Sequence, residues 1–408
     1  MLKANELAFQ KMIETDPVLV DIVLLKDAVK IEKTTFLHAG PPISFEKMCT
    51  PMKGAVICGL LNERLADSPQ EAEKMALSGK ITFKPCHEYG LVGPMTGITT
   101  YSMPVWVVED RKTKKRSFAN LSEGSGVGLR FGEYTKETLD RLDWMKDTAM
   151  PVFKEVIKQL GGIDLAPIMA QGLSMGDELH MRNHATTAQI VKLISYKIAE
   201  ISPEHGSAVI KYMSVGNDQF FLNLAMAANK LAADAADNIK GSSMVVAIAR
   251  NGVEIGIRIS GLPGQWFTAP SPMVKGLYFP GYSEKDANPD IGDSAIMETG
   301  GFGGCAMITA PAIIKFVGAK NVKVAENLTE SMYEISLGEH PIYQIPILNF
   351  RGIPVGIDIM KVVETGITPV LNTAIASNQS GVGMVGAGMS TLPISIFEDA
   401  LVALSESL

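Results

Sequence analysis

Polar side chains are densest in the segment GLSMGDELHMRN, which ends at Asn183. A glycine-rich turn is expected to lead into a helix whose first turn carries Asp177, where the helix dipole favours an acid. Asp177, His180 and His184 would then lie on one helical face, at positions i, i+3 and i+7. This arrangement can bind a metal ion, but its spacing is not specific for one. The sequence favours a substrate site here over a metal site, and we assign no metal.

The same expected helix carries Glu178 and Arg182, which stand four residues apart. An ordinary ion pair on the helix surface explains this spacing. Arg182 also has the planar donor pattern that holds a carboxylate through two hydrogen bonds. With His180 nearby, the segment offers both a proton carrier and a fixed positive charge.

A second polar segment, PCHEYGLVGPMTG, follows a predicted strand. Cys86 stands beside His87, but adjacent residues on an extended chain point to opposite sides, so a Cys–His nucleophile pair is not expected. The run from Gly93 to Gly97 predicts a tight turn. Its amides and the Thr96 hydroxyl could hold an anion, although a plain turn explains the run equally well.

Asp290, Asp293 and Glu298 stand close together, ahead of the glycine-rich run from Gly300 to Gly304. Asp290 and Asp293 could bind a cation or position a lysine or arginine side chain. Asx turns and helix caps explain these two acids equally well. Both interpretations stay open at this point.

A further polar group, Glu364, Thr365 and Asn372, opens a stretch that contains no Asp, Glu, Lys or Arg until Glu398. A buried pair of strands with tight glycine turns would explain this stretch. The alternative is a pocket wall or a subunit contact, where glycine lets another group approach the backbone closely.

The elements that must position these residues differ along the chain. Apolar residues recur at helical spacing from Leu139 to Leu160, and Pro151 must kink this helix or begin a second one. Asn217 is expected to cap a helix that runs to Ile239. Elsewhere short apolar runs alternate with glycine and proline turns, which predicts strands.

Two pairs of predicted strands resemble hairpins. One pair flanks Asn251-Gly252, a dipeptide that tolerates positive φ, and the other flanks Arg351-Gly352. Hairpins grouped with intervening helices favour an α+β fold over a repeating βαβ sheet. We predict two mixed α/β domains, residues 1–135 and 242–408, that flank a small helical domain, residues 136–241.

Composition excludes several classes of function. The chain has 408 residues and a formal net charge of −7, which argues against a nucleic-acid-binding protein. The densest basic stretch, Arg111 to Arg116, is interpreted as a solvated hairpin loop. The four cysteines show no C-x-x-C spacing, which fits reduced cytosolic thiols. No signal peptide and no membrane span is expected, so we predict a cytoplasmic protein.

Cofactor and nucleotide motifs are missing from the sequence. Neither G-x-G-x-x-G nor G-x-x-x-x-G-K-[ST] occurs, so no dinucleotide fold, no P-loop and no cofactor is predicted. Hydrophobic residues make up 46% of the chain and charged residues only 20%. More surface than usual is therefore expected to be covered by another subunit, and the isolated chain is expected to be a homo-oligomer.

Several motifs together resemble the AllG/YlbE-type family. They are His38-Ala-Gly-Pro-Pro42, Gly93-Pro-Met-Thr-Gly97, Gly176-Asp-Glu-Leu-His-Met-Arg-Asn183, Asp218-Gln-Phe-Phe-Leu-Asn-Leu-Ala225, Asn288-Pro-Asp-Ile-Gly-Asp-Ser294 and Val363-Glu-Thr-Gly-Ile-Thr-Pro369. The resemblance implies several α+β domains around a small helical one. It also implies one subunit of oxamate carbamoyltransferase, with FdrA-type and AllH-type subunits as partners. This enzyme converts oxalurate and phosphate to oxamate and carbamoyl phosphate during anaerobic allantoin breakdown.

The resemblance brings no assigned catalytic residues, so we assign roles from chemistry. Carbamoyl transfer needs anion holders and a group that polarises the carbonyl or handles the amide proton, but no covalent nucleophile. The candidate catalytic residues are Asp177, His180, Arg182 and His87. The candidate substrate-binding residues are Lys53, Gly93, Thr96, Gly97, Glu178, Asn183, Arg258, Asp290, Asp293, Glu364, Thr365 and Asn372. The usual S-x-R-T carbamoyltransferase motif is absent.

Three hypotheses remain open. The chain is a catalytic subunit acting on small anionic substrates, or a structural or ligand-holding subunit whose partner does the chemistry, or a metal-dependent amidohydrolase. A relative of the carbamoyltransferase subunits that acts on another small carboxylate or amide would show the same motifs.

Overall fold

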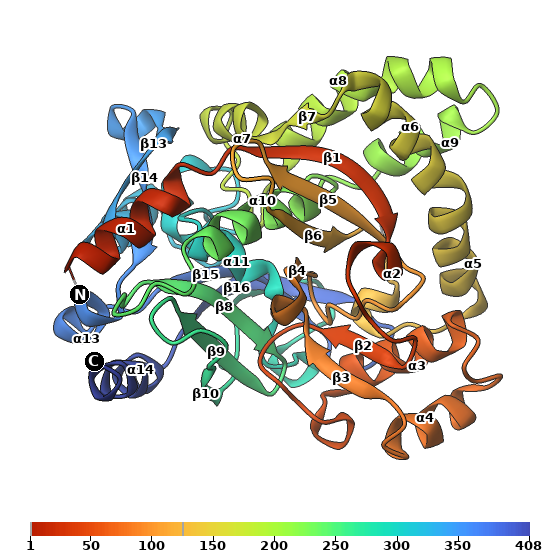
Figure 1. Ribbon diagram of the computed structural model, residues 1–408, viewed down its shortest axis with the longest axis horizontal. Helices are drawn as coiled ribbons and strands as arrows, with labels where there is room; N and C mark the ends of the chain where they lie inside the picture. The colour runs from red at the N-terminus through yellow and green to blue at the C-terminus, as the bar shows by residue number, and fades with distance from the viewer. Residues whose placement is uncertain (1, 125) are drawn as a thin grey trace.

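Helices and short strands alternate along the chain, and the strands form several small sheets (Figure 1). The structure is a computed structural model that describes residues 2–124 and 126–408. The predicted α+β class is confirmed. Both termini lie on the same side of the molecule, where α1 (Leu2–Ile13) packs against β13 and β14.

The largest sheet has five strands in the order β4-β6-β5-β1-β7. Its strands are β1 (Pro17–Leu24), β4 (Leu91–Val92), β5 (Pro104–Asp110), β6 (Arg116–Asn120) and β7 (Ile163–Asp164). Strands β5 and β6 are antiparallel and joined by residues 111–115. The basic stretch is therefore the predicted hairpin loop except for Arg116, which begins β6. Strand β1 pairs with both β5 and β7, so segments far apart in sequence share one sheet.

The remaining strands form four smaller sheets. One has the order β10-β9-β8-β12: β8 (Val245–Asn251), β9 (Glu254–Ile259), β10 (Phe267–Pro270) and β12 (Ile291–Gly292). A second joins β11 (Lys275–Tyr278), β16 (Met384–Thr391) and β15 (Val370–Ala376). The last two pair β13 (Ser336–Ile345) with β14 (Arg351–Ile357), and β2 (Thr35–His38) with β3 (Thr82–Pro85).

The helices pack around these sheets. They are α2 (Leu25–Ala28), α3 (Thr50–Asn62), α4 (Pro69–Leu77), α5 (Lys136–Trp144), α6 (Met150–Leu160), α7 (Leu165–Ser174), α8 (His184–Ile201), α9 (Gly206–Ser214), α10 (Leu222–Ala235), α11 (Ile296–Thr299), α12 (Val322–Glu334), α13 (Ile359–Thr365) and α14 (Ser395–Glu406). Helix α10 packs on β5 and β6 and also contacts α1 and α11, so it links the N-terminal and C-terminal parts. The division into three domains stays a prediction.

The local predictions had mixed outcomes. The Asn251-Gly252 hairpin is confirmed, because β8 and β9 pair in antiparallel register around it. The Arg351-Gly352 turn is wrong, because both residues lie in β14 and the chain reverses at 346–350 instead. There Asn349 and Phe350 adopt positive φ, a conformation that the turn itself requires.

Of the two helix predictions, the one for Pro151 is confirmed and the one for Asn217 is wrong. Helix α6 begins at Met150, with Pro151 in its first turn, and it follows a π-helical segment, Met145–Ala149, after α5. Asn217 does not cap a helix, because α10 begins only at Leu222. Phe220 packs edge-on against Trp106 with ring centroids 6.1 Å apart, and this burial holds residues 217–221 in a turn.

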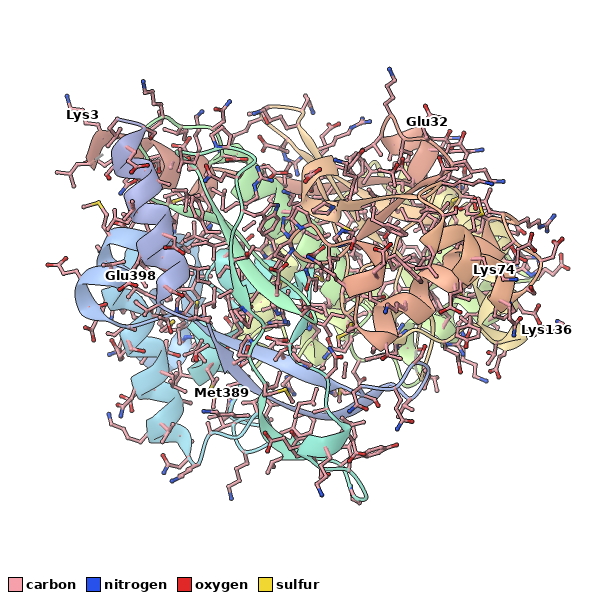
Figure 2. The ribbon with its side chains drawn as sticks, turned by 90° about the horizontal axis from the view of Figure 1, so that it is seen from below. Lys3, Glu32, Lys74, Lys136, Met389 and Glu398 are labelled. Atoms are coloured by element: carbon pink, nitrogen blue, oxygen red, sulfur yellow. The ribbon has the colours of Figure 1, made fainter. Side chains whose placement is uncertain are left out.

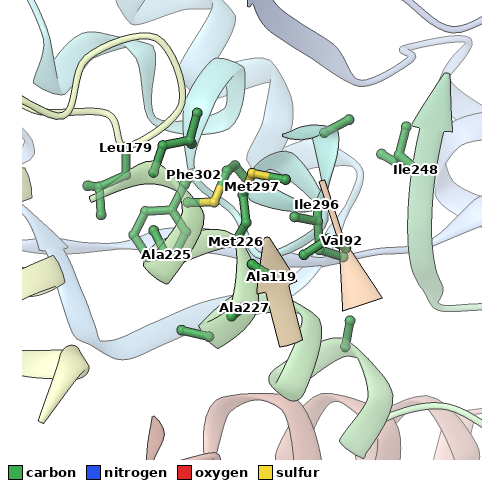
Figure 3. Close-up of a cluster of buried hydrophobic side chains, with 14 of the residues drawn as sticks. Val92, Ala119, Leu179, Ala225, Met226, Ala227, Ile248, Ile296, Met297 and Phe302 are labelled. Atoms are coloured by element: carbon green, nitrogen blue, oxygen red, sulfur yellow. The ribbon is translucent and has the colours of Figure 1, made fainter. Parts of the chain in front are cut away.

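The core beneath the site is a continuous cluster of apolar side chains. Figure 3 shows Ala225, Met226 and Ala227 of α10 beside Met297 and Phe302. Because α10 lies between the large sheet and the C-terminal strands, this cluster fixes the two parts of the chain against each other.

Many charged side chains lie on the outside of the molecule, as Lys3, Glu32, Lys74, Lys136 and Glu398 show in Figure 2. Over the ranges 2–124 and 126–408, none of the helices is long and apolar enough to cross a membrane.

Candidate functional site

A cavity of about 510 Å³ lies where three parts of the chain meet. Its wall comes from the segments 94–95, 120–124, 126–127 and 130–131, from 180–181, 184, 216–219 and 222–223, and from Ser294, Phe316, Ala374 and 382–384. The first group precedes α5, the second surrounds α8 and α10, and the third belongs to the C-terminal part. Ala374 and Met384 lie on the strand pair β15–β16, so the uncharged C-terminal stretch is both a buried strand pair and part of a pocket wall.

The polar segment that ends at Asn183 is a loop, not the predicted helix. Helix α7 ends at Ser174 and α8 begins at His184. Glu178 is fully buried and accepts the backbone N–H groups of the next residues, 180–182. Leu179 adopts a positive φ of 64° and inserts into the core (Figure 3). The hydrogen bonds between the buried Glu178 carboxylate and these backbone N–H groups therefore replace the helical hydrogen bonds that the sequence pattern predicts.

His180 lines the cavity and is held from behind by a buried acid. Its Nδ1 lies 2.8 Å from Oε1 and 3.0 Å from Oε2 of Glu298, which stands 118 residues away on α11. The Glu298 side chain is fully buried. Its Oε1 also accepts the backbone N–H of Gly304 at 2.9 Å and of Asn372 at 3.0 Å.

This geometry suits proton transfer. A carboxylate that accepts a hydrogen bond from Nδ1 fixes the imidazole tautomer and leaves Nε2 as the nitrogen that exchanges a proton with a ligand. In the described part of the chain, no hydrogen bond occupies Nε2 of His180. The pair is therefore a candidate general acid–base in the cavity wall.

A second buried carboxyl lies behind the same histidine. Glu178 Oε2 accepts a hydrogen bond of 3.3 Å from the Asn372 amide. Burial raises the pKa of Glu178 from 4.5 to about 7, with nearby Glu298 adding to the rise and His180 opposing it. The site thus holds two carboxyl groups close to one histidine, and near neutral pH a proton resides on Glu178 in part of the molecules.

Replacing Glu178 by Gln should change how stability depends on pH. Because the folded state keeps this proton up to about pH 7 and the unfolded chain loses it near pH 4.5, the wild-type free energy of unfolding falls across that window, by about 3 kcal/mol for this group. Glu178→Gln removes this contribution. Burial also raises the pKa of Asp293 to about 7, so a second decline of similar sign remains.

Urea unfolding of the wild type and Glu178→Gln between pH 4.5 and 7.5 measures the difference. The variant should lose less stability over this window, while Glu73→Gln, on the exposed surface of α4, should follow the wild type. Parallel curves for the wild type and Glu178→Gln would contradict the assignment of a buried, protonated Glu178.

Gly303 allows the histidine and the glutamate to approach. It has a positive φ of 58°, and a Cβ there would lie 2.1 Å from Glu298 Oε1 and 3.0 Å from the His180 Cβ. The glycine run ahead of residue 305 therefore serves the site by leaving room for the buried carboxylate.

We expect Gly303→Ala to displace Glu298 and to lower both stability and activity. The strained φ costs about 1–2 kcal/mol, and the clash adds about 1–3 kcal/mol. Gly161→Ala is the matched control, because Gly161 also has positive φ but a Cβ there would meet nothing within 4 Å. Chemical unfolding and turnover assays should show a larger loss for Gly303→Ala. Equal losses for the two variants would refute the steric argument.

Arg182 and Asp177 lie together just outside the cavity wall. Arg182 Nη1 donates to Asp177 Oδ1 at 2.6 Å, and Asp177 Oδ2 accepts the Thr186 backbone N–H at 2.8 Å. The helical spacing predicts an ion pair between Arg182 and Glu178. That prediction is wrong, because Arg182 pairs with Asp177 instead. Asn183 is buried and donates to the His180 carbonyl at 3.2 Å. This group braces the loop that carries His180, and its roles stay predictions.

His184 lies at the edge of the cavity, with its Nε2 3.6 Å from Asp218 Oδ2. The prediction that His184 shares one helical face with Asp177 and His180 is wrong, because α8 begins only at His184. Asp177 and His180 lie in the preceding loop, where they pair with Arg182 and Glu298. Within the residues that the structure covers, no three His, Cys, Asp or Glu side chains are arranged as a metal site.

His87 and Asp293 form a second buried cluster. His87 Nε2 lies 3.6 Å from Asp293 Oδ1, which also accepts the Gly40 backbone N–H at 2.8 Å. Burial lowers the pKa of His87 well below 6.5. Cys86 shares a turn with His87, yet its thiol contacts the Gly97 carbonyl at 3.3 Å, and burial raises its pKa. The two residues lie in a 3-10 helix, Cys86–Tyr89, and not on the extended chain that was predicted, and among the described residues the Cys86 thiol is directed to Gly97.

The predicted anion turn lies between this cluster and the cavity. The Gly93 N–H points to Asp293 Oδ2 at 3.4 Å, and the Thr96 N–H donates to the Arg130 carbonyl at 3.2 Å. Gly97 has a positive φ of 63°. Pro94 and Met95 line the cavity, whereas Thr96 is buried behind them.

Other predicted binding residues lie apart from the cavity wall. Asp290 is a fully buried partner of Arg250, with 3.1 Å between Oδ2 and Nε. Arg258 pairs with Asp237 at 2.9 Å, and Lys53 lies on α3 over the Phe45 ring. Two remaining candidates, Glu364 and Thr365, are exposed at the end of α13.

Sequence reasoning missed two residues of the site. Glu298 stands out in the sequence as one of three neighbouring acids, but nothing local shows that it faces His180. Arg130 lies in the cavity wall directly after the segment NLSEGSGVG. That glycine-rich segment was a signal, since such loops approach ligands closely, but it matched no known phosphate motif.

Comparison with known proteins identifies the family. Residues 81–294 match the family described as oxamate carbamoyltransferase subunit AllG. A protein of Escherichia coli K12 with the name oxamate carbamoyltransferase subunit AllG is 47% identical over 380 residues, which are 92% of this chain and 90% of that protein. An uncharacterized protein of the same organism, YahG, is 45% identical, covering 99% of this chain and 86% of the relative.

A solved structure shows the same fold. It is the crystal structure of a conserved protein of unknown function from Enterococcus faecalis V583, with a TM-score of 0.97 and 43% identity. The match covers 100% of this chain and 98% of that chain. From the family match and the 47% identity over most of its length, the chain belongs to the AllG family of oxamate carbamoyltransferase subunits.

Proposed function

We propose that this chain is a subunit of an oxamate carbamoyltransferase and that carbamoyl transfer takes place in the cavity lined by His180. The location of the site is supported by the His180–Glu298 pair, in which a buried acid orients a histidine at a cavity wall. The type of reaction is supported by the membership of the chain in the AllG family. In the breakdown of allantoin, this step would release carbamoyl phosphate and oxamate from oxalurate and phosphate.

The proposed reaction needs one proton transfer to the leaving group. A phosphate oxygen attacks the carbamoyl carbon of oxalurate, a C–O bond forms and the C–N bond to the oxamate nitrogen breaks. The oxamate nitrogen must gain a proton as it leaves. His180 Nε2 takes a proton from the phosphate and returns it to this nitrogen, while Glu298 stabilises the imidazolium that forms between the two steps.

The cavity wall also offers groups that recognise an amide. Asn120, Asn217 and Asn223 line it. Asn223 is held in place because its Nδ2 donates to the Asn120 carbonyl at 2.7 Å and to Asn120 Oδ1 at 2.9 Å. Carboxamides present both donors and acceptors, which match the ureido group of oxalurate.

A second candidate function is the same type of chemistry on another small carboxylate or amide. The near-equal identity to AllG and to the uncharacterized YahG favours keeping this candidate. The same wall would serve such a substrate, because the amide groups and His180 recognise features that these compounds share.

The subunit partners are part of the proposal. The relative's name describes a subunit of a larger enzyme. We propose FdrA-type and AllH-type chains as the partners, and the absence of cofactor and metal stays a prediction from the sequence.

The test is an assay of carbamoyl phosphate formation from oxalurate and phosphate. The purified chain is assayed alone and then mixed with the subunits encoded beside it. Activity of the chain alone would place the whole site here, and activity only in the mixture would support a shared site. No activity in either would mean that this relative acts on a different substrate.

A further inference from the structure

The cavity wall also contains an arginine with an unusual environment. Arg130 follows a glycine-rich loop, of which the structure describes residues 123–124 and 126–128, and its side chain is 18% exposed. Its Nη2 donates to the carbonyls of Gly124 at 3.0 Å and Gly126 at 2.7 Å. The guanidinium is thereby fixed in place by the loop, in which both glycines have positive φ.

The other end of the guanidinium lacks a good partner. Arg130 Nη1 is buried and has no hydrogen bond with any residue that the structure describes. The nearest carboxylate oxygen, Glu123 Oε2, is 3.8 Å away and is likewise buried without a hydrogen bond in the described chain. Two opposite charges that lie this close without bonding leave both groups undersatisfied.

The charges around this loop favour an anion near Arg130. Glu123 accepts the Arg130 backbone N–H at 2.8 Å through Oε1. Arg141 donates to the Val127 carbonyl of the same loop at 2.9 Å, so a second guanidinium adjoins it. Burial lowers the pKa of Arg130, with Arg141 also lowering it and Glu123 opposing the change. A bound oxyanion would offset both the burial of the Arg130 charge and its repulsion by Arg141.

The neighbouring turn supports the same conclusion. The Arg130 carbonyl accepts the Thr96 N–H from the turn that runs from Gly93 to Gly97. Pro94 and Met95 of this turn line the cavity beside Arg130. The segment that the sequence marked as an anion turn is therefore joined to the arginine by a backbone hydrogen bond.

We propose that Arg130 holds the oxyanion of the bound substrate, a carboxylate or a phosphate, and that this anion competes with Glu123 for the guanidinium. The inference rests on the proposed function for the identity of the anion, because oxamate carries a carboxylate and the second substrate is phosphate. It assigns to Arg130 the anion-holding role that residue type alone had suggested for Arg182, Lys53 and Arg258.

Calorimetric titration of the purified chain with inorganic phosphate, and separately with oxamate, tests the proposal without turnover. Arg130→Gln should weaken binding by about tenfold or more, since it removes a charged hydrogen-bond donor. Glu123→Gln should tighten binding by about threefold, because it removes the competing charge but keeps an oxygen for the Arg130 N–H. Arg116→Gln, an exposed arginine paired with Glu109, is the control and should bind as the wild type does.

Using both Arg130→Gln and Glu123→Gln distinguishes a lost anion contact from a folding defect. If Arg130→Gln disturbs the loop, Glu123→Gln still must tighten binding, and a disturbed loop would not produce that result. An effect on phosphate alone assigns Arg130 to the phosphate, and an effect on oxamate alone assigns it to the carboxylate. No binding of either anion to the wild type, or equal binding in all variants, would overturn the proposal. Anion binding that depends on Arg130, in a chain that forms no carbamoyl phosphate either alone or mixed with its partner subunits, would refute the proposed function and leave this inference standing.

Discussion

Replacing His180 by Gln should lower the rate of carbamoyl transfer by about 10²–10⁴-fold, the usual contribution of a positioned general acid–base. Gln cannot carry a proton between phosphate and the leaving nitrogen, although its amide can still donate a hydrogen bond. The fold should survive, because the core around Leu179 and Phe302 does not depend on the imidazole (Figure 3). The measurement is kcat for carbamoyl phosphate formation by the complex assembled with the variant chain.

The matched control for this prediction is His205→Gln. His205 is about half exposed at the start of α9 and pairs with its neighbour Glu204. Its replacement should leave kcat unchanged. If His180→Gln also turned over at the wild-type rate, His180 would not take part in proton transfer, and the proposed site would be wrong.

Replacing Glu298 by Gln should reduce kcat by a similar factor through a different cause. The Gln oxygen, at the position of Oε1, can keep the hydrogen bonds from Gly304 and Asn372, while its amide takes the place of Oε2, 3.0 Å from His180 Nδ1. The amide carries no negative charge, so it no longer stabilises the imidazolium, and its N–H favours the tautomer with the proton on Nε2. Stability should stay equal or rise, because a buried charge is removed.

Two readouts separate this positioning role from a structural one. A double variant, His180→Gln with Glu298→Gln, should be no slower than His180→Gln alone, because the acid acts through the histidine. The pH profile of kcat should also shift in Glu298→Gln. Glu330→Gln, on the surface beside Arg351, provides the control. Additive losses in the double variant would contradict the coupling of the two residues.

Parts of the fold that depend on local chemistry could be predicted from the sequence. The Asn251-Gly252 hairpin is an example, because both residues favour the turn and the flanking strands pair directly. The basic stretch 111–115 is another, since a charged loop between apolar strands has few alternatives. Arg351-Gly352 resembles a two-residue hairpin turn like Asn251-Gly252. The turn lies upstream of it, however, because Pro346 ends the preceding strand.

The site could be predicted only in part, because its partners are far apart in sequence. His180 was found as a candidate, yet its acid Glu298 lies 118 residues away, and Asn372 lies 194 residues from Glu178. The helix predicted to carry Asp177 in its first turn does not form there, because Glu178 is buried and accepts backbone N–H groups. Residue type alone favoured Arg182 as an anion holder, but its pairing with Asp177 could be known only from the fold.

A crystal structure of this chain with oxamate and phosphate bound would show whether the cavity at His180 is the site. We expect electron density for the anions in the cavity, with a ligand atom within hydrogen-bonding distance of His180 Nε2. Glu298 should keep its contacts with Nδ1 and with the Gly304 and Asn372 backbone. Anions bound elsewhere on the chain, or a cavity without ligand in crystals of a chain that forms an active complex, would contradict this location of the site.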